Sequence, residues 1–186
     1  MNFIPHLDLV GEHAFLGASK FHWLNYDDKK LIQTFQNLQI TERGTELHDI
    51  AARLVKLGIK LPTTRKTLNM YVNDAIKYSL TTEQPLYFSR NCFGTADGIS
   101  YDERTKFLRI HDLKTGRTEA HMEQLKIYAA LFCLEYCKDP TQLSIELRIY
   151  QNDSIIIDKP DGKEIRKIME TIVRFDDMIE KLKLEE

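Results

Sequence analysis

The spacing of apolar residues changes from a helical period to a strand-like period near Leu86, and this change limits the folds open to the chain. Before it, apolar residues recur every three or four positions, which predicts a helical N-terminal part over about residues 13–80. After it come a hairpin and a helix over about 86–137, then a hairpin and a helix over about 143–183. This order predicts an α/β fold, a small mixed β-sheet flanked by helices, in a single domain spanning residues 1–186.

Local patterns predict where the individual elements begin and end. The N-terminal part divides into helical segments at 13–39, 41–58 and 64–79. Ser19 is a candidate cap for the first segment, and Gly58 is a natural stop for the second. In the first hairpin the polar sequence "DERT" separates the runs "LYFSRNCFGTADGISY" and "KFLRIHDLK". The second hairpin is expected to turn at Asn152–Asp153, and the helix between the hairpins to cover about 118–137.

Composition excludes several classes of protein. The chain has 186 residues and 42% hydrophobic residues, which is ordinary for a soluble globular protein. Its net charge of −2 gives no bulk attraction for nucleic acid, so such a partner would need a local basic patch. Three cysteines without paired spacing favour a reducing compartment. Because there is no basic leader and no apolar run of about 20 residues, we expect a cytoplasmic protein without a membrane span.

Two acidic residues and a lysine lie in the first hairpin, where strand cores should be apolar. A loop centred on Arg104–Thr105 places Asp97 directly opposite Asp112. A loop centred one residue earlier places Asp97 opposite Ile110, one diagonal step from Asp112. Lys114 shares the face of Asp112, because alternate strand residues point the same way. Either register therefore brings the two acids and the lysine together.

Like charges that face each other destabilise a sheet, so either one carboxylate holds a proton or a cation lies between the two. A hard divalent cation such as Mg²⁺ takes carboxylate oxygens. The lysine could then orient or deprotonate the attacking water, which would make a site for phosphodiester hydrolysis. The pattern alone is weak, since Asp97 lies in the turn-like "ADG" and Asp112 could simply pair with Lys114 on an exposed face.

Four short motifs occur in an order that resembles the RecB-type branch of the PD-(D/E)XK nucleases, including its free-standing phage exonucleases and CRISPR-associated nucleases. "ERGTELH" at 42–48 resembles the first motif and "GTAD" at 94–97 the second. "HDLK" at 111–114 is similar to the third motif, and "QLKIY" at 124–128 to the Q-x-x-x-Y motif. The N-terminal "LGASKFHWL" is similar to the family's opening serine motif. The resemblance covers about residues 13–130, and the ordered set is more specific than any one member.

The resemblance implies a PD-(D/E)XK core with Mg²⁺ or Mn²⁺ as the cofactor. Asp97, Asp112 and Lys114 would be the catalytic residues, with Lys114 acting on the attacking water. The metal ligands would be His48, Asp97, Asp112 and the main-chain carbonyl of Leu113. A histidine at the edge of an apolar helix stripe is also a common core residue, so position 48 alone does not decide the matter.

The resemblance also implies residues that contact DNA. Gln124 and Tyr128 would line the site, and their spacing of four places them on one helix face, although they also fit an ordinary helix edge. Glu42, at the start of the first motif, would support the site from further out. Among the basic residues near the hairpin, Arg117 and Lys126 flank the proposed site and are the best candidates for phosphate contacts.

The sequence departs from some relatives of that branch. CRISPR-associated and several helicase-linked members carry four cysteines that hold an iron–sulfur cluster, whereas this chain has three, so we expect no such cluster. Cys133 and Cys137 are expected to be buried thiols on one helix face. No G-x-x-x-x-G-K-[ST] loop occurs, so no ATP-driven helicase is attached.

Together these features predict a Mg²⁺- or Mn²⁺-dependent deoxyribonuclease, an exonuclease of recombination, repair or phage DNA processing. Its partners would be DNA with free ends and a recombinase or single-strand-binding protein, and a homo-oligomer fits the family. One alternative is a non-catalytic DNA-binding or recombinase-partner protein with a nuclease-like fold. Another is an HD-type phosphohydrolase, since "HD" occurs at 48–49 and 111–112. Adjacent strand residues point to opposite faces, however, so His111 and Asp112 are poorly placed to bind one metal.

Overall fold

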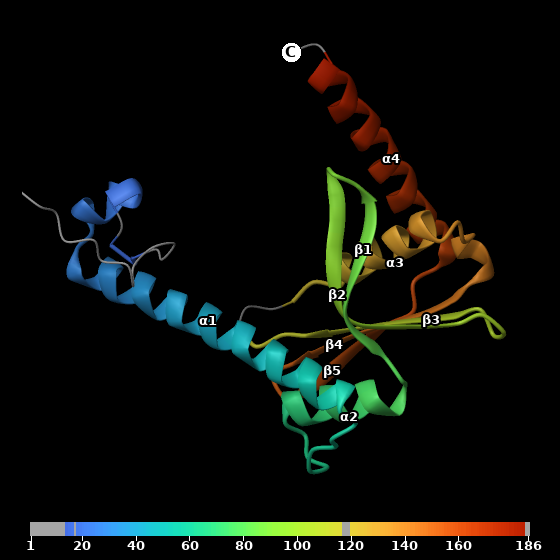
Figure 1. The fold of residues 1–186 in the computed structure, drawn as a ribbon, viewed down its shortest axis with the longest axis horizontal. Coiled ribbons are helices and arrows are strands. Elements are labelled where there is room, and N and C mark those ends of the chain that lie inside the picture. The colour runs from blue at the N-terminus through green and yellow to red at the C-terminus, as the bar shows by residue number, and fades with distance from the viewer. Residues whose placement is uncertain (1–13, 17, 117–119, 185–186) are drawn as a thin grey trace, which may run out of the picture. The chain divides into compact units, whose positions relative to one another are not determined.

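The computed structural model describes residues 14–16, 18–116 and 120–184 (Figure 1). Its backbone contacts divide the chain into two units, residues 1–43 and 44–186. The first unit holds the 3-10 helix η2 (Ala18–Asn25) and the N-terminal part of helix α1 (Asp28–Lys56). The second unit holds the rest of α1 and every described strand. The prediction of a single nuclease domain stays a prediction.

One helix, α1, takes the place of the first two predicted helical segments. Asp27 sets its start by accepting a hydrogen bond from the N–H of Lys30 at 2.7 Å. The helix continues through the boundary between the predicted segments, because Gly44 alone costs only about 1 kcal/mol inside a helix of 29 residues. Gly58, with φ of 66°, follows its end as predicted. Residue 13 and the side chain of Ser19 lie outside the described residues.

A five-stranded mixed sheet forms the centre of the second unit, in the order β1-β2-β3-β4-β5. Only β3 and β4 pair in parallel. The predicted helix at 64–79 is α2 (Thr67–Lys77). These elements confirm the α/β class and a mixed sheet flanked by helices. The strands are β1 (Thr81–Ser89), β2 (Cys92–Asp102), β3 (Phe107–Leu113), β4 (Ser144–Gln151) and β5 (Ser154–Asp158).

The first predicted strand run is in fact two strands. The chain turns at residues 90–91, so that β1 and β2 form a long antiparallel ribbon. The prediction of one continuous run was wrong because the turn contains no glycine or proline. Ser89 closes it instead, by accepting a hydrogen bond from the N–H of Asn91 at 3.1 Å. β1 itself was hidden by Glu83, which has a positive φ, and by Pro85, both unusual inside a strand.

The register of β2 and β3 is the first of the two predicted. Gly98 pairs with His111, and each following pair keeps that register up to the loop. The ladder ends at this pair, and one further step in the same register would place Asp97 opposite Asp112, whose charges interact. The sequence therefore predicted correctly that the two acids would meet across this hairpin.

Helix α3 (Glu123–Glu135) connects the parallel strands β3 and β4, because parallel neighbours need a crossover. It packs with helix α4 (Gly162–Leu184) against one face of the sheet, around the buried side chains of Ile110 and Leu147. Helix α2 and the C-terminal end of α1 cover the other face, where Tyr71 and Tyr150 meet edge to face at 5.5 Å (Figure 1). The two layers give the sheet a core on each side.

Helix α3 is shorter than the predicted helix at about 118–137, and residues 117–119 lie outside the described residues. It ends at Glu135, and Cys137 follows with φ of 51°. The N–H of Lys138 donates to the carbonyl of Cys133, which closes the helix end. Cys133 is buried as predicted, but Cys137 is exposed, so the prediction that both thiols are buried was wrong.

The second hairpin and the last helix follow the prediction. β4 and β5 join at Asn152 and Asp153, both with positive φ, which is the backbone that a tight two-residue hairpin turn requires. α4 then packs by its first turns against α3, and Ile165 is fully buried in the core on this side of the sheet. Among the described helices, none has the length and apolar character needed to span a membrane.

Candidate metal centre

Three elements of the second unit bring a histidine and two acids together. His48 comes from α1, Glu83 from β1 and Asp97 from β2, and one ligand atom of each lies within 4.8 Å of the others. The closest pair is His48 Nδ1 and Asp97 Oδ2, at 3.4 Å. The hydrogen bond to Asp97 raises the pKa of His48, while its partial burial acts in the opposite direction. A cation-binding arrangement thus forms where α1 meets the β1–β2 ribbon.

Small residues and backbone contacts set the positions of these side chains. A Cβ at Gly44 would lie 2.8 Å from Oγ1 of Thr115, so the glycine lets α1 approach the end of β3 closely. Asp97 is held twice: the hydroxyl of Tyr71 donates to its carbonyl at 2.7 Å, and the N–H of Leu113 donates to its Oδ2 at 2.8 Å. His48, one helical turn after Gly44, therefore reaches a fixed carboxylate.

Asp112 is the most unusual group of the centre. Its side chain is buried, and neither carboxylate oxygen has an aligned hydrogen-bond donor among the described residues. Lys114 Nζ lies 3.0 Å from Oδ2 and forms an ion pair with it. Burial and the nearby charge of Asp97 raise the pKa of Asp112 to about 6, and Lys114 opposes part of that rise. A buried carboxylate with unused oxygens is costly, which is the condition that a cation would relieve.

The donor set fits a hard divalent cation. Asp97 and Asp112 offer carboxylate oxygens, which Mg²⁺ and Mn²⁺ accept. The N–H of Leu113 points to Asp97, and a strand residue directs its N–H and C=O to the same edge, so the Leu113 carbonyl faces the centre as well. The His48–Glu83–Asp97 cluster does not include Asp112, whose charge interacts with that of Asp97. Asp97 thus links this cluster to the other predicted ligands.

A chain of polar side chains leads from Asp112 to helix α3. Lys114 Nζ donates to Gln124 Oε1 at 2.8 Å, and Gln124 Nε2 donates to the hydroxyl of Tyr128 at 2.9 Å. Gln124 and Tyr128 share a helix face, as predicted. A Cβ at Gly94 would lie 2.9 Å from the Tyr128 ring, so this glycine allows the ring to lie against β2. The lysine is therefore oriented from both sides.

Glu83 was not among the predicted site residues. It lies in β1 with φ of 51°, a left-handed backbone that costs energy in a non-glycine residue. Its partial burial, followed by the charge of Asp97, raises its pKa. No family motif marks this position, and the predicted strand run begins only at Leu86, so the first half of β1 was missed. Only Pro85, two residues after Glu83 in an otherwise β-prone segment, indicated an irregular strand.

Three other predicted residues are not brought into this cluster. Lys126 forms ion pairs with Glu164 and Asp158, at 2.7 and 3.3 Å, on the side of α3 opposite to Gln124. Glu42 belongs to the first unit and is an exposed residue of α1. Arg117 lies outside the described residues.

His111, the other half of the second "HD" pair, lies on the opposite face of β3 from Asp112. It is fully buried, and its Nδ1 lies 3.1 Å from the hydroxyl of Tyr150. Burial, then the charges of Arg148 and Arg109, lower its pKa to about 2, so the ring is neutral. His111 and Asp112 therefore do not converge on one metal, which removes the main support for an HD-type site at this pair.

We compared the chain with protein families, curated proteins and solved structures. No family model matches the chain, and the curated proteins and the solved structures contain no match either.

Proposed function

We propose that this chain is a Mg²⁺- or Mn²⁺-dependent DNA nuclease with a PD-(D/E)XK core. One observation carries the proposal: the carboxylate of Asp112 is buried near the charge of Asp97, its Oδ2 pairs with Lys114 Nζ at 3.0 Å, and its Oδ1 has no partner among the described residues. Two acids held together at this depth are a poor structural element without a cation. The ordered motifs that resemble the RecB-type branch supply the reaction class.

The proposed roles follow from the contacts of each side chain. His48, Asp97, Asp112 and the Leu113 carbonyl would hold the cation, with Glu83 beside them. When bound, the cation would neutralise the negative charge of the phosphodiester as it is cleaved. Lys114, paired with Asp112, would orient the attacking water and exchange a proton with it.

Helix α3 has a positioning task in this proposal. Gln124 holds the ammonium of Lys114 through its side-chain oxygen, and it holds Tyr128 through its side-chain nitrogen. Tyr128 then lies at the end of the chain of hydrogen bonds, where it would contact the DNA strand. Removing the amide of Gln124 would leave the lysine free to rotate away.

The resemblance to phage and repair nucleases extends the proposal to the biological setting. The substrate would be DNA with free ends, cut by an exonuclease in the cytoplasm during recombination, repair or phage DNA processing. A recombinase or a single-strand-binding protein would be the natural partner, and a homo-oligomer remains part of the same expectation.

Calorimetric titration with Mn²⁺ tests the metal centre directly. Wild-type protein should bind Mn²⁺, and Asp97→Ala should lose at least tenfold in affinity because this carboxylate belongs both to the predicted ligand set and to the His48–Glu83–Asp97 cluster. Glu103→Gln, in an exposed loop where Glu103 pairs with Lys138, is the matched control and should bind as the wild type does.

Digestion of linear and circular DNA with Mn²⁺ then tests the activity. Loss of linear DNA with circular DNA intact would support an exonuclease. DNA binding without any cleavage would replace the proposal by the non-catalytic alternative. Wild-type Mn²⁺ affinity in Asp97→Ala would remove the metal centre itself.

A further inference from the structure

A row of exposed side chains starts beside the metal centre and extends along one face of the β1–β2 ribbon toward its turn. Pro85 is paired with Thr95, and Tyr87 with Phe93, and all four are exposed. In the same register, Glu83 and Asp97 occupy the position before them. The alternate residues Leu86 and Ala96 are buried instead, in the core that contains α3. One face of the ribbon is thus solvated from the acids to the aromatic pair.

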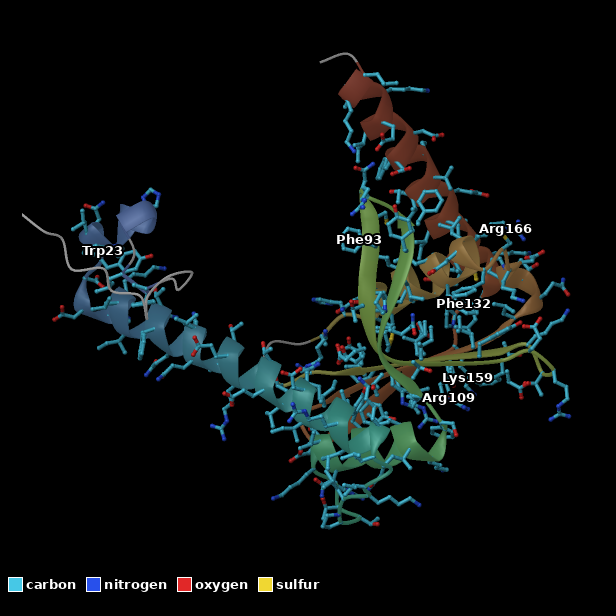
Figure 2. All side chains as sticks on the ribbon, viewed as in Figure 1. Trp23, Phe93, Arg109, Phe132, Lys159 and Arg166 are labelled. Carbon is cyan, nitrogen blue, oxygen red and sulfur yellow. The ribbon has the colours of Figure 1, made fainter. Side chains whose placement is uncertain are left out.

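The aromatic pair consists of two neighbouring rings with similarly oriented planes, which we call the platform. The ring centroids of Tyr87 and Phe93 are 6.5 Å apart, and the ring planes differ by 29°. Their exposed fractions are 47% and 67%, which is high for two neighbouring aromatic residues in a sheet. Figure 2 shows Phe93 projecting from the ribbon on the side away from α3 and α4. Exposed apolar groups that gather in this way usually mark a contact surface.

The edge of the ribbon argues against addition of a strand from another protein. The outward-pointing backbone positions of β1 in this region include Pro85, which has no N–H. At the next outward position, the N–H of Tyr87 already donates to Glu135 Oε2 at 2.9 Å. Pro85 has no donor and the donor of Tyr87 is occupied, so this edge lacks the free N–H groups that strand addition requires. The face, not the edge, is available to a partner.

Base stacking fits this face. Nearly parallel aromatic rings accept the π-face of any base, which makes stacking tolerant of sequence. Phe93 lies four strand residues from Asp97, or roughly 13 Å along β2 at the usual rise per residue. A strand whose phosphate lies at the metal centre could therefore reach the rings within a few nucleotides. Bases in a duplex are stacked on one another, so only unpaired bases can use the platform.

We propose that Tyr87 and Phe93 bind unpaired bases of a single-stranded nucleic acid and that this face of the ribbon leads the strand to the metal centre. The assignment rests on the proposed nuclease function, since that function places a phosphodiester at Asp97. It names the substrate class of the same centre as a single strand or a single-stranded end.

Fluorescence anisotropy with a labelled single-stranded oligonucleotide and a matched blunt duplex, in EDTA to prevent cleavage, tests the proposal. The double variant Tyr87→Ala/Phe93→Ala should bind the single strand at least tenfold more weakly, since both stacking surfaces are removed. Phe93→Trp should keep wild-type affinity, because the ring face is retained. Tyr136→Ala removes a tyrosine of equal exposure, 47%, that packs on Phe132 of α3 and serves as the control; it should change affinity less than twofold.

A fluorescent base reports stacking directly. Oligonucleotides that carry 2-aminopurine at successive positions should show quenching at one or two positions only, and the quenching should disappear in the double variant. Unchanged single-strand affinity in the double variant would overturn the proposal. So would an equal loss of duplex and single-strand affinity, or a change in sedimentation coefficient, which would make the aromatic pair a protein interface.

Failure of the nuclease proposal is distinguishable from failure of this one. The double variant should keep wild-type Mn²⁺ affinity and should still cleave bis(4-nitrophenyl) phosphate, which is too small to reach the rings. If wild-type protein neither binds Mn²⁺ nor cleaves that ester, the nuclease proposal is wrong. If it does both while the double variant retains full affinity for single strands, only the stacking platform is wrong.

Discussion

At the scale of single residues, Asp112 determines how the protein responds to pH. Its carboxylate is buried, lies opposite Asp97 and is only partly compensated by Lys114. Burial and the charge of Asp97 together raise its pKa from 3.8 to about 6, so the folded protein holds this proton more tightly than the unfolded chain does. The charged form therefore destabilises the metal-free protein above that pKa.

The free energy of unfolding in EDTA should rise as the pH falls from about 7 to about 4, because protonation of Asp112 favours the folded state. The gain is on the order of 2 kcal/mol, given the size of the shift. The amide side chain of Asp112→Asn does not ionise. This variant should therefore be more stable than wild type at pH 7.5, and its free energy of unfolding should show no such rise. Urea unfolding of both proteins at pH 7.5, 6 and 5 measures the difference. A constant difference across that range would contradict the burial argument.

Lys114→Ala should separate metal binding from catalysis. The ammonium is not a ligand, so Mn²⁺ affinity should persist, while cleavage should fall by roughly 10²–10⁴-fold if the lysine moves a proton. Gln124→Ala removes the oxygen that accepts from Lys114 and should lower kcat more than it changes KM. Single-turnover cleavage with saturating Mn²⁺ measures both. Wild-type cleavage by Lys114→Ala would exclude the lysine from the reaction.

Residue-scale prediction from the sequence succeeded where strand register alone decides the geometry. Asp97, Asp112 and Lys114 could be placed because an antiparallel loop fixes which residues face each other. Glu83 could not, because its left-handed backbone and its approach to His48 depend on contacts between α1 and β1 that are distant in the sequence. Local patterns contain no information on such contacts.

At the scale of elements, the start of α4 depends on a glycine. A Cβ at Gly162 would lie 2.4 Å from the carbonyl oxygen of Pro140, and a backbone atom cannot rotate away. Gly162→Ala should therefore lower the free energy of unfolding by about 1–3 kcal/mol. Gly116→Ala is the matched control, since a Cβ there meets no atom within 4 Å. Chemical denaturation measures both, and equal stability of the two variants would show that the crowding is relieved elsewhere.

Helix α2 takes its cap from the turn between β4 and β5. Lys66, at its N-cap position, makes no side-chain cap, whereas Asp153 Oδ1 accepts from the N–H of Thr67 at 2.9 Å and from its hydroxyl at 3.0 Å. Asp153→Gly keeps the positive φ of the turn but removes the cap, so it should cost about 1 kcal/mol. Asn152→Gly keeps the cap and should be neutral. Thermal unfolding compares them, and an equal effect of both would assign the cost to the turn.

The elements that the sequence predicted well are those with a strong period and clear ends. α4, α2 and the β4–β5 hairpin meet both conditions. The β1–β2 turn and the continuity of α1 were missed for opposite reasons: a turn formed without glycine or proline, and a helix passed through a glycine. The turn is closed by a local hydrogen bond of Ser89, and the helix continues because one glycine costs too little to end it.

At the scale of the whole molecule, the charge balance limits how phosphate groups can be held. The net charge is −2, Lys126 is bound to Asp158 and Glu164, and Lys114 is bound to Asp112. We therefore expect few phosphate contacts, so that a plot of log Kd against log salt has a slope shallower than about 3 in magnitude. Titration between 50 and 300 mM KCl measures it. A slope near 7 would contradict this expectation.

The parallel pairing of β3 with β4 also governs the order in which a newly made chain becomes competent. Asp112 lies beside Ile149, so the residues from 114 to 143 must leave the ribosome before that neighbour can pair. Closing so long a loop is entropically expensive and slow. A product of interrupted translation that stops after residue 128 would contain every position named by the family motifs, yet it would lack the strand that keeps water from Asp112. Such a fragment should lack the proposed nuclease activity, which we expect to appear only after β4 has been synthesised.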